Sequence, residues 1–392
     1  MNSDSTYAEP SAFRILGYVY FTFISYLAIG LPLAVIPTQV HFRMGYAAWV
    51  AGLVISIQSV ATLVSRPWAG RIGDRVGAKV SVQWGMLCCA LSGLLVAASA
   101  WLGARPALSL TVLVLSRLAL GVAESLGSTG STLWGISALG QKSTARVISY
   151  NGVSTYGAQA FGAPIGVVLA ARWGLNSIGL LIALIGAVSF VLASRKAAVP
   201  VIAGEHLPFR SVLGRVAPHG AALALGGVGY GTLGAFVTLY YASRHWTGAA
   251  LCLTAFGLAF VAARFLLLWT IYRYGGFATA IGSLAIESVG LAMLWLAHGP
   301  SMAVAAAATA GFGFSLVFPA LAVEAVRHIP VPSRGTALSV YTAFVDVSFF
   351  VAGPVAGLVI GGFGYASAFL FALICVLIGL AIVLALRASV RG

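Results

Sequence analysis

Apolar runs of roughly 20 residues recur almost without a break along this chain, separated by short polar joints. A helix of that length crosses the hydrocarbon core of a bilayer, so each run predicts a membrane-spanning helix. Of the 392 residues, 60% are hydrophobic and 8% are charged, whereas about a quarter of an average soluble domain is charged. A chain of this composition cannot cover its surface in water, and its length predicts many spans rather than several soluble domains.

The runs predict an all-α membrane protein with 12 transmembrane helices in two six-helix bundles. Residues 194–218 form the longest polar stretch. We therefore predict a first bundle over residues 1–193, a cytoplasmic linker over 194–218 and a second bundle over 219–392. The expected spans lie near residues 13–40, 47–69, 80–102, 107–136, 145–171, 176–195, 216–241, 247–270, 276–297, 301–326, 335–360 and 364–388.

The distribution of basic residues predicts how the chain is oriented. The formal charge of +14 does not indicate nucleic-acid binding, because the basic residues are scattered and form no basic face. With a cytoplasmic N-terminus, 17 of the 22 basic residues fall in inside joints, Arg66 and Arg264 among them. The positive-inside rule then places both termini in the cytoplasm of a bacterial inner membrane. No removable signal peptide is expected, because no basic segment with a short apolar core and cleavage site begins the chain.

The sequence offers little support for redox, metal or nucleotide chemistry. All four cysteines fall inside apolar runs, where they are expected to pack, and the histidines show no metal-ligand spacing. No phosphate-binding loop occurs, and no nucleophile and base stand at a recognised enzymatic spacing. We expect no cofactor, no metal and no enzyme activity.

An internal repeat relates the two halves of the sequence. The matched pairs are Arg66 with Arg264, Arg75 with Arg273 and Gly77 with Gly275 at an offset of 198 residues, then Pro164 with Pro354 and Gly174 with Gly364 at an offset of 190. The fall in offset from 198 to 190 fits an insertion in the first half near residues 101–106. Two parallel six-span repeats with a site at their interface are known among secondary transporters.

The joint after the second expected span reads GRIGDRVGAK, from Gly70 to Lys79. Gly70 and Gly77 permit a tight crossing between helices. Asp74 can cap the next helix, and Arg75 and Lys79 can pair with carboxylates or with carbonyls at helix C-termini. A turn with a capping aspartate and inward positive charge would need the same residues.

This joint resembles the signature loop of the major facilitator superfamily, G-x-L-x-D-R-x-G-R-K, with Ile72 and Ala78 as departures. The resemblance implies the family fold and a gating loop that latches the two halves, formed here by Gly70, Asp74, Arg75, Gly77 and Lys79. The stretches SYLAIGLPLAVIP and AGLVISIQSVATLVSRPWAG further resemble a bacterial efflux subgroup, YhhS/YfcJ-like or arabinose-efflux-like.

The fourth expected span carries two charges. Leu113, Arg117 and Gly121 resemble the pattern of proton-coupled exporters in this family, although Leu120 replaces the usual polar residue. A charge at mid-span costs at least ~2.5 kcal/mol, so Arg117 needs a wet cavity or a partner. Glu124 lies about 20° from the same stripe but ~10 Å along the axis, so no direct pair is expected. A proton or anion site and a structural charge remain the alternatives.

Asp346 and Glu287 lie near the middle of the eleventh and ninth expected spans. Burial disfavours the charged form of a carboxylate, so both are candidates to exchange protons. The family resemblance puts the ninth span at the periphery, which ranks Glu124 and Asp346 above Glu287. Glu324, at the cytoplasmic end of the tenth span, is expected to cap a helix or join a salt bridge.

Two further groups of residues are candidates for bending and for the substrate cavity. Gly162 with Pro164, and Gly353 with Pro354, resemble the exporter-associated G-P-x-x-G-G motif and also suit simple helix packing. Tyrosines and threonines in the first and seventh spans can contact sugars or amphipathic drugs, or can join helices instead. The cavity candidates are Thr22, Tyr26, Gln39, Tyr230, Thr232 and Thr238.

Together these features predict a secondary transporter that exports a small solute by alternating access, driven by protons. A sugar, organic-anion or siderophore importer of the same fold is the alternative, and a non-transporting membrane receptor or scaffold, or an intramembrane enzyme, is the alternative of another class. We expect a monomer embedded in the bilayer, with a small molecule as its substrate.

Overall fold

The computed structural model describes residues 12–140, 143–199, 209–327, 329 and 334–391. This part of the chain is built from helices and contains no strand. The helices are α1 (Ala12–Leu33), α2 (Ile36–Thr38), the π-helical turn η1 (Gln39–Arg43), α3 (Ala48–Arg75), α4 (Ala78–Trp101), α5 (Pro106–Leu139), α6 (Thr144–Trp173), α7 (Leu175–Arg195), α8 (Phe209–Ser243), α9 (Ala250–Leu267), α10 (Trp269–Tyr274), α11 (Gly276–Trp295), α12 (Pro300–Phe314), α13 (Val317–Val326), α14 (Arg334–Phe363) and α15 (Ser367–Arg391).

Within the described residues, 12 helical segments are long and apolar enough to cross a membrane, so the predicted spans are confirmed. The first span combines α1, α2 and η1, and the tenth combines α12 and α13. The break after α1 follows from its prolines, because Pro32 and Pro37 lack the N–H that a continuous helix would use. The polypeptide is therefore a multi-pass membrane protein.

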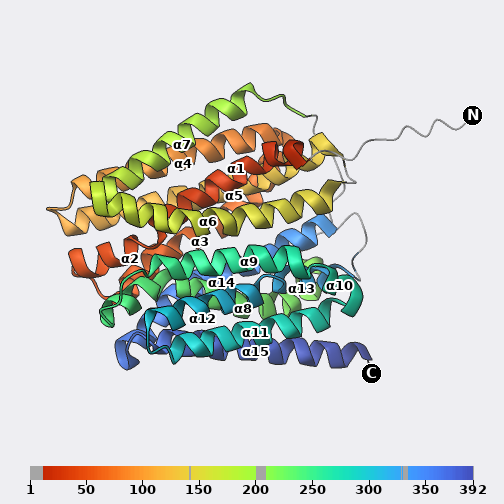
Figure 1. The fold of residues 1–392 in the computed structure, drawn as a ribbon. Helices are drawn as coiled ribbons and strands as arrows, with labels where there is room; N and C mark the ends of the chain where they lie inside the picture. Colours follow the sequence, from red (N-terminus) through yellow and green to blue (C-terminus); the bar gives the residue numbers. More distant parts are fainter. Residues whose placement is uncertain (1–11, 141–142, 200–208, 328, 330–333, 392) are drawn as a thin grey trace, which may run out of the picture.

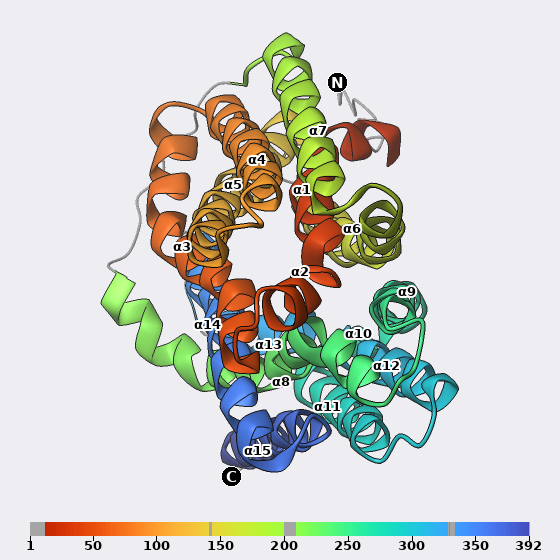
Figure 2. The same ribbon diagram turned by 90° about the vertical axis from the view of Figure 1, so that its left-hand side faces the viewer.

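The helices form two bundles that lie side by side, α1–α7 above α8–α15 (Figure 1). The beginning of α1 and the end of α15 lie at the same end of the molecule (Figure 1). Figure 2, seen from the opposite end, shows α3 beside α14 and α6 beside α9, and these pairs contact each other along the boundary. At this opposite end α2 also contacts α8.

The structure changes the predicted extent of the linker and the placement of two basic residues. The linker expected over 194–218 is shortened at both ends, because α7 runs to Arg195 and α8 begins at Phe209; residues 200–208 are outside the described part. Arg66 and Arg264, counted with the cytoplasmic joints, lie inside the spans Ala48–Gly73 and Ala250–Leu267.

The joint expected from Gly70 to Lys79 is also mostly helix. Because α3 continues to Arg75, Gly70 and Asp74 lie in its last turns, and only Val76 and Gly77 separate it from α4. Gly77 has φ +119°, a conformation open to glycine, and it occupies the N-cap position of α4, where Asp74 was expected to act. The side chain of Asp74 lies outside the described part of the chain.

Small residues allow helices of the two halves to approach closely. A Cβ atom on Gly353 of α14 would lie 2.4 Å from the carbonyl oxygen of Gly52 on α3, so neither position has room for a side chain. On the other boundary, Pro164 cannot bond to the carbonyl of Ala160, and the hydroxyl of Thr254 on α9 donates to that oxygen at 3.0 Å. Gly162 lies against the backbone of Gly30 on α1, within the first half. Pro354 lies inside α14.

Candidate functional site

An ion pair joins the two halves inside the membrane-spanning region. Arg66 of α3 donates from Nε and Nη2 to the two carboxylate oxygens of Asp346 on α14, a bidentate arrangement. The side chains are 15% and 5% exposed, so water screens the pair only weakly. The sequence singled out Asp346 but assigned its partner to a joint.

Gln58 connects the two charges of α5 that cannot reach each other. Its Nε2 donates to Glu124 at 2.8 Å, and its Oε1 accepts from Nη2 of Arg117. Thr62, one turn further along α3, donates to the same carboxylate oxygen of Glu124 at 3.0 Å. All four side chains are buried. Arg117 and Glu124 therefore share a face without a direct pair, as predicted. Gln58 of α3 contacts both of them, while Nε and Nη1 of Arg117 have no hydrogen-bond partner among the described residues.

Tyr26 completes this group of side chains, and we call the group the polar cluster. Tyr26, on α1, lies near enough to Glu124, Arg66 and Asp346 to interact electrostatically with all three. Glu124 in turn interacts with Asp346 and Arg66. Two carboxylates and two guanidiniums thus share one buried region at the boundary. Its residues are Tyr26, Gln58, Thr62, Arg66, Arg117, Glu124 and Asp346.

Aromatic side chains cover the other boundary, between α6 and the second half. The rings of Tyr156 and Phe260 are stacked with centroids 3.7 Å apart. Tyr230 of α8 lies edge-on to Tyr156 at 5.5 Å and donates its hydroxyl to Oε1 of Gln159 at 2.6 Å. We call these rings the aromatic cluster. Its residues are Tyr156, Tyr230, Phe256, Phe260 and Phe314.

Arg264 lies beside the aromatic cluster and is 7% exposed. Its guanidinium carbon is 5.2 Å from the ring centroid of Phe260, and it interacts electrostatically with Tyr156. No carboxylate of the described residues pairs with it, and its Nε has no hydrogen-bond acceptor there. A cation–π contact contributes about 0.5–2 kcal/mol, less than the several kcal/mol that burying a guanidinium costs.

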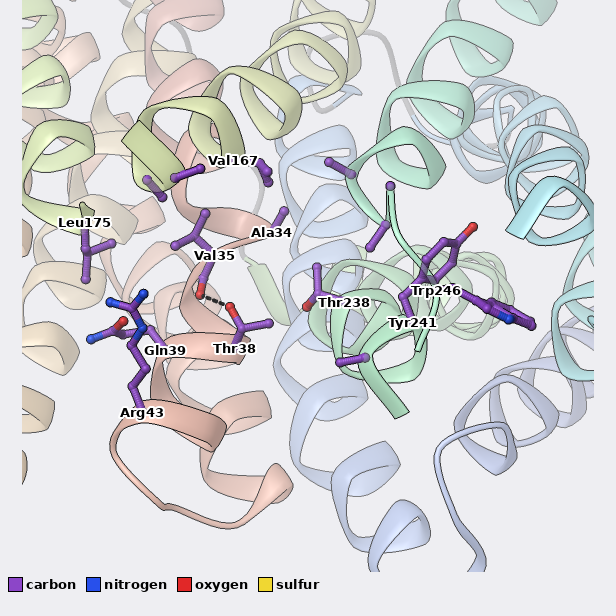
Figure 3. Close-up of a pocket in the computed structure, with 16 residues that line it drawn as sticks. Ala34, Val35, Thr38, Gln39, Arg43, Val167, Leu175, Thr238, Tyr241 and Trp246 are labelled. Carbon is purple, nitrogen blue, oxygen red and sulfur yellow. Dashed lines mark hydrogen bonds between the residues drawn. The ribbon is translucent and has the colours of Figure 1, made fainter. Parts of the chain in front are cut away.

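A pocket of about 340 Å³ lies between the halves, beside η1 and the last turns of α8. Gln39, Thr38 and Arg43 line it from the first half, and Thr238 and Trp246 from the second (Figure 3). Arg43 is the one charged residue among the residues that line it. Two of the six cavity candidates, Gln39 and Thr238, thus face one pocket.

The remaining candidates lie elsewhere. Thr22 donates to Ser131 of α5 at 3.0 Å inside the first half, so its hydroxyl joins helices there. Thr232 is fully buried in α8, and its hydroxyl has no partner among the described residues. Glu287 is fully buried among helices of the second half, and its oxygens likewise lack described partners. Glu324 accepts from the N–H of Gly276 at 3.1 Å, which confirms its capping role.

Lys79 was expected to pair near a helix C-terminus, and it does so within one half. Its Nζ donates to the carbonyl of Ser194, in the last turn of α7, at 2.8 Å. This contact joins α4 to α7 of the first bundle. The predicted latch between the halves therefore receives no support from Lys79 in this arrangement.

Sequence reasoning did not single out several residues that complete the site. Gln58, Thr62 and Gln159 are uncharged and lie in apolar runs, where nothing distinguishes them from packing residues. Arg66 and Arg264 did carry a signal, because the repeat pairs them, but they were assigned to joints. The same repeat could have drawn attention to Tyr156, since an offset of 190 residues places it at the position equivalent to Asp346.

Comparison with known proteins identifies close relatives. The sequence profile described as Major Facilitator Superfamily matches residues 19–251. An uncharacterized MFS-type transporter of Pseudomonas aeruginosa (strain UCBPP-PA14) is 51% identical over 378 residues, covering 96% of this chain and 94% of the relative. One of the same description from Burkholderia pseudomallei (strain 1106a) is 49% identical over 385 residues, covering 97% and 95%.

Solved structures share the fold at low sequence identity. The nucleoside transporter NupG superposes with a TM-score of 0.73 at 14% identity, covering 97% of this chain and 99% of that one. The human organic anion transporter MFSD10 (TETRAN) superposes with a TM-score of 0.72 at 15% identity, covering 95% and 100%. At such identity the likeness establishes the 12-helix, two-bundle fold and nothing about the substrate.

Proposed function

Because the chain belongs to the major facilitator superfamily, we propose that it exports a small solute across the bacterial inner membrane by alternating access, in exchange for protons. In this scheme the two halves rock about a solute bound between them. The relatives are named as transporters without a substrate, so the transported solute is a separate question.

The ion pair between Arg66 and Asp346 is the observation that carries the proposal of proton coupling. A proton on Asp346 removes the charge that holds the guanidinium of Arg66. Breaking a buried pair by neutralising one partner costs about 3–5 kcal/mol, because the other charge stays buried and uncompensated. A proton at this position would therefore weaken the contact between α3 and α14 and favour separation of the halves there.

Glu124 offers a second proton position beside the first. It interacts electrostatically with Asp346, and two neighbouring carboxylates resist being ionised together. Gln58 and Thr62 donate to the carboxylate, which stabilises its charged form. A proton that leaves one carboxylate can thus be taken up by the other, so that the total charge of the polar cluster, which also holds Arg66 and Arg117, does not change.

The direction of transport is proposed from sequence patterns. The exporter-like patterns around Arg117 and around Pro164 and Pro354, and the resemblance to the arabinose-efflux-like subgroup, favour efflux of a drug, sugar or metabolite. Uptake of a sugar or organic anion by the same fold is the alternative.

The excess of basic residues in one set of joints supports two cytoplasmic termini. We propose a functional monomer.

Reconstitution into proteoliposomes tests the coupling. A thermal-shift screen of sugars, organic acids, metallophores and drugs first identifies a ligand, because a compound that binds the folded state stabilises it. Flux of that ligand is then followed under an imposed pH gradient. Asp346→Asn and Glu124→Gln are expected to abolish gradient-driven flux, whereas Glu287→Gln, a buried carboxylate inside the second half, is expected to retain it.

Unchanged coupling in both Asp346→Asn and Glu124→Gln would remove the proton assignment. Ligand binding without any flux, with or without a gradient, would favour a receptor or scaffold over a transporter. A sodium gradient in place of the pH gradient serves as the control for the identity of the ion.

A further inference from the structure

The two boundaries between the halves are related by the internal repeat, yet they differ in charge. The repeat pairs Arg66 with Arg264 and Asp346 with Tyr156. On one boundary Arg66 of α3 meets the carboxylate of Asp346 on α14. On the other, Arg264 of α9 meets Tyr156 of α6, which carries a neutral phenol in place of the carboxylate. The second boundary therefore has the cation without the matching anion.

The guanidinium of Arg264 is buried without an anionic partner among the described residues. Its side chain is more than nine-tenths buried, and its Nε has no acceptor among the described residues. No carboxylate in the described part of the chain lies within ion-pair distance. A guanidinium presents a planar fork of donors that suits a carboxylate or phosphate. A mobile anion can supply here what Asp346 supplies on the opposite boundary.

Gly152 of α6 faces the guanidinium of Arg264. A Cβ atom built on this glycine would stand 3.7–3.8 Å from the guanidinium atoms, at van der Waals contact. The repeat pairs Gly152 with Thr342, so this boundary also lacks a side chain that the other carries. At this position α6 therefore offers the guanidinium no side-chain acceptor.

The surroundings of Arg264 suit a flat apolar group. Tyr156 and Phe260 stack, and Phe314 and Tyr230 lie edge-on or tilted around them, with ring centroids between 3.7 and 6.2 Å from one another. Rings from α6 of the first half and α8, α9 and α12 of the second meet here, at the boundary where alternating access needs its ligand. An aromatic ligand gains both dispersion and edge-to-face contacts in such a setting.

We propose that Arg264 and the aromatic cluster form the substrate site, and that the substrate class is an aromatic organic anion. Its carboxylate pairs with Arg264 beside Gly152, and its ring packs against Tyr156 and Phe260. This inference rests on the proposed transport function, because it names the solute class for that function. Tyr156 also interacts electrostatically with Glu287 and, more weakly, with Glu124 of the polar cluster.

Binding by the purified protein tests the inference without any pH gradient. The probes are aromatic carboxylates from benzoate to 1-naphthoate, each paired with its uncharged amide. Thermal shift and fluorescence titration are expected to give an affinity for the acids at least tenfold above that for the amides. Arg264→Gln is expected to remove this preference, and Arg264→Lys to restore part of it. Arg273→Gln, which removes an exposed charge on the next helix, α10, serves as the matched control.

A second variant, Gly152→Val, tests the inference independently of whether the Arg264→Gln protein folds. Gly152→Val leaves every charge in place and puts a branched side chain against the guanidinium, so it is expected to weaken acid binding at least tenfold with little change in the melting temperature of the free protein. Equal affinity for acids and amides in the wild-type protein would overturn the inference, as would a preference that survives both variants. Because no gradient is present, loss of proton coupling in proteoliposomes cannot produce either result.

Discussion

Arg66 and Asp346, 280 residues apart in the chain, form a bidentate ion pair that joins α3 of the first half to α14 of the second. The pair belongs to both halves at once, so any change in its charge acts on their contact. It therefore links a single protonation event to the relative position of the two bundles.

Removing one partner of this pair is expected to be worse than removing both. Asp346→Asn or Arg66→Gln should each lower the free energy of unfolding by about 3–5 kcal/mol, because a buried charge loses its partner. The double variant should recover part of that loss. Denaturation in detergent checks the cycle. The pair of Glu324 and Arg327 is the control. The guanidinium of Arg327 is exposed to water, so this pair should contribute less than about 1 kcal/mol. Additive losses at Arg66 and Asp346 would contradict coupling between them.

Replacing Gln58 by leucine is expected to disturb both charges of α5. The substitution leaves Arg117 and Glu124 without the amide that each contacts, and a buried polar group without a partner costs about 1–3 kcal/mol. Gln83→Leu, at an exposed glutamine that bonds Ser194, should change stability little. Unfolding measurements on both variants make the comparison, and equal stability would show that Gln58 does not support the polar cluster.

Gly353→Ala is expected to force the halves apart near Gly52. The added methyl group would overlap the backbone of α3, and overpacking of this kind costs about 1–3 kcal/mol. Gly361→Ala lies on the same helix with no atom within 4 Å of the added Cβ, so it should be neutral or stabilising. Melting temperatures and transport rates are compared between the two variants. A Gly353→Ala protein as stable and active as the control would rule out a close approach at this position.

Tyr365→Phe is expected to loosen the end of the boundary that holds the pocket. The hydroxyl of Tyr365, between α14 and α15, is hydrogen-bonded to Nε2 of His41 on η1 at 2.9 Å. In a Thr238→Cys background, a membrane-impermeant maleimide should then label the pocket several times faster. The same background without Tyr365→Phe provides the reference rate, and an unchanged rate would show that this bond does not hold the halves together.

Asp74→Asn is expected to slow turnover more than it weakens ligand binding. The prediction rests on the resemblance of residues 70–79 to the gating loop of the superfamily, which acts on the movement of the halves rather than on the ligand. Transport kinetics and binding affinity are measured on the same preparation. Unaltered kinetics would remove Asp74 from the gating mechanism.

The sequence alone determined the number of membrane spans and the candidate charges. Apolar length sets the number of spans, since a helix in lipid must be about 20 residues long and must bond its own backbone. The repeat set the two-half organisation, and the cost of a charge in lipid drew attention to Arg117, Glu124 and Asp346. These arguments depend on local composition, which the folded structure does not change.

Tertiary structure decided which groups meet. Arg66 and Arg264 lie near the ends of their expected spans, and their charge assigned them to the cytoplasmic joints; hydropathy could not show that they lie on the boundary between the halves. Neither spacing nor composition fixes how a helix is rotated against helices from the other half, because that rotation follows from packing over hundreds of residues of separation. The pairing of Arg66 with Asp346, and the absence of a carboxylate partner at Arg264 among the described residues, therefore depend on how α3, α6, α9 and α14 pack together.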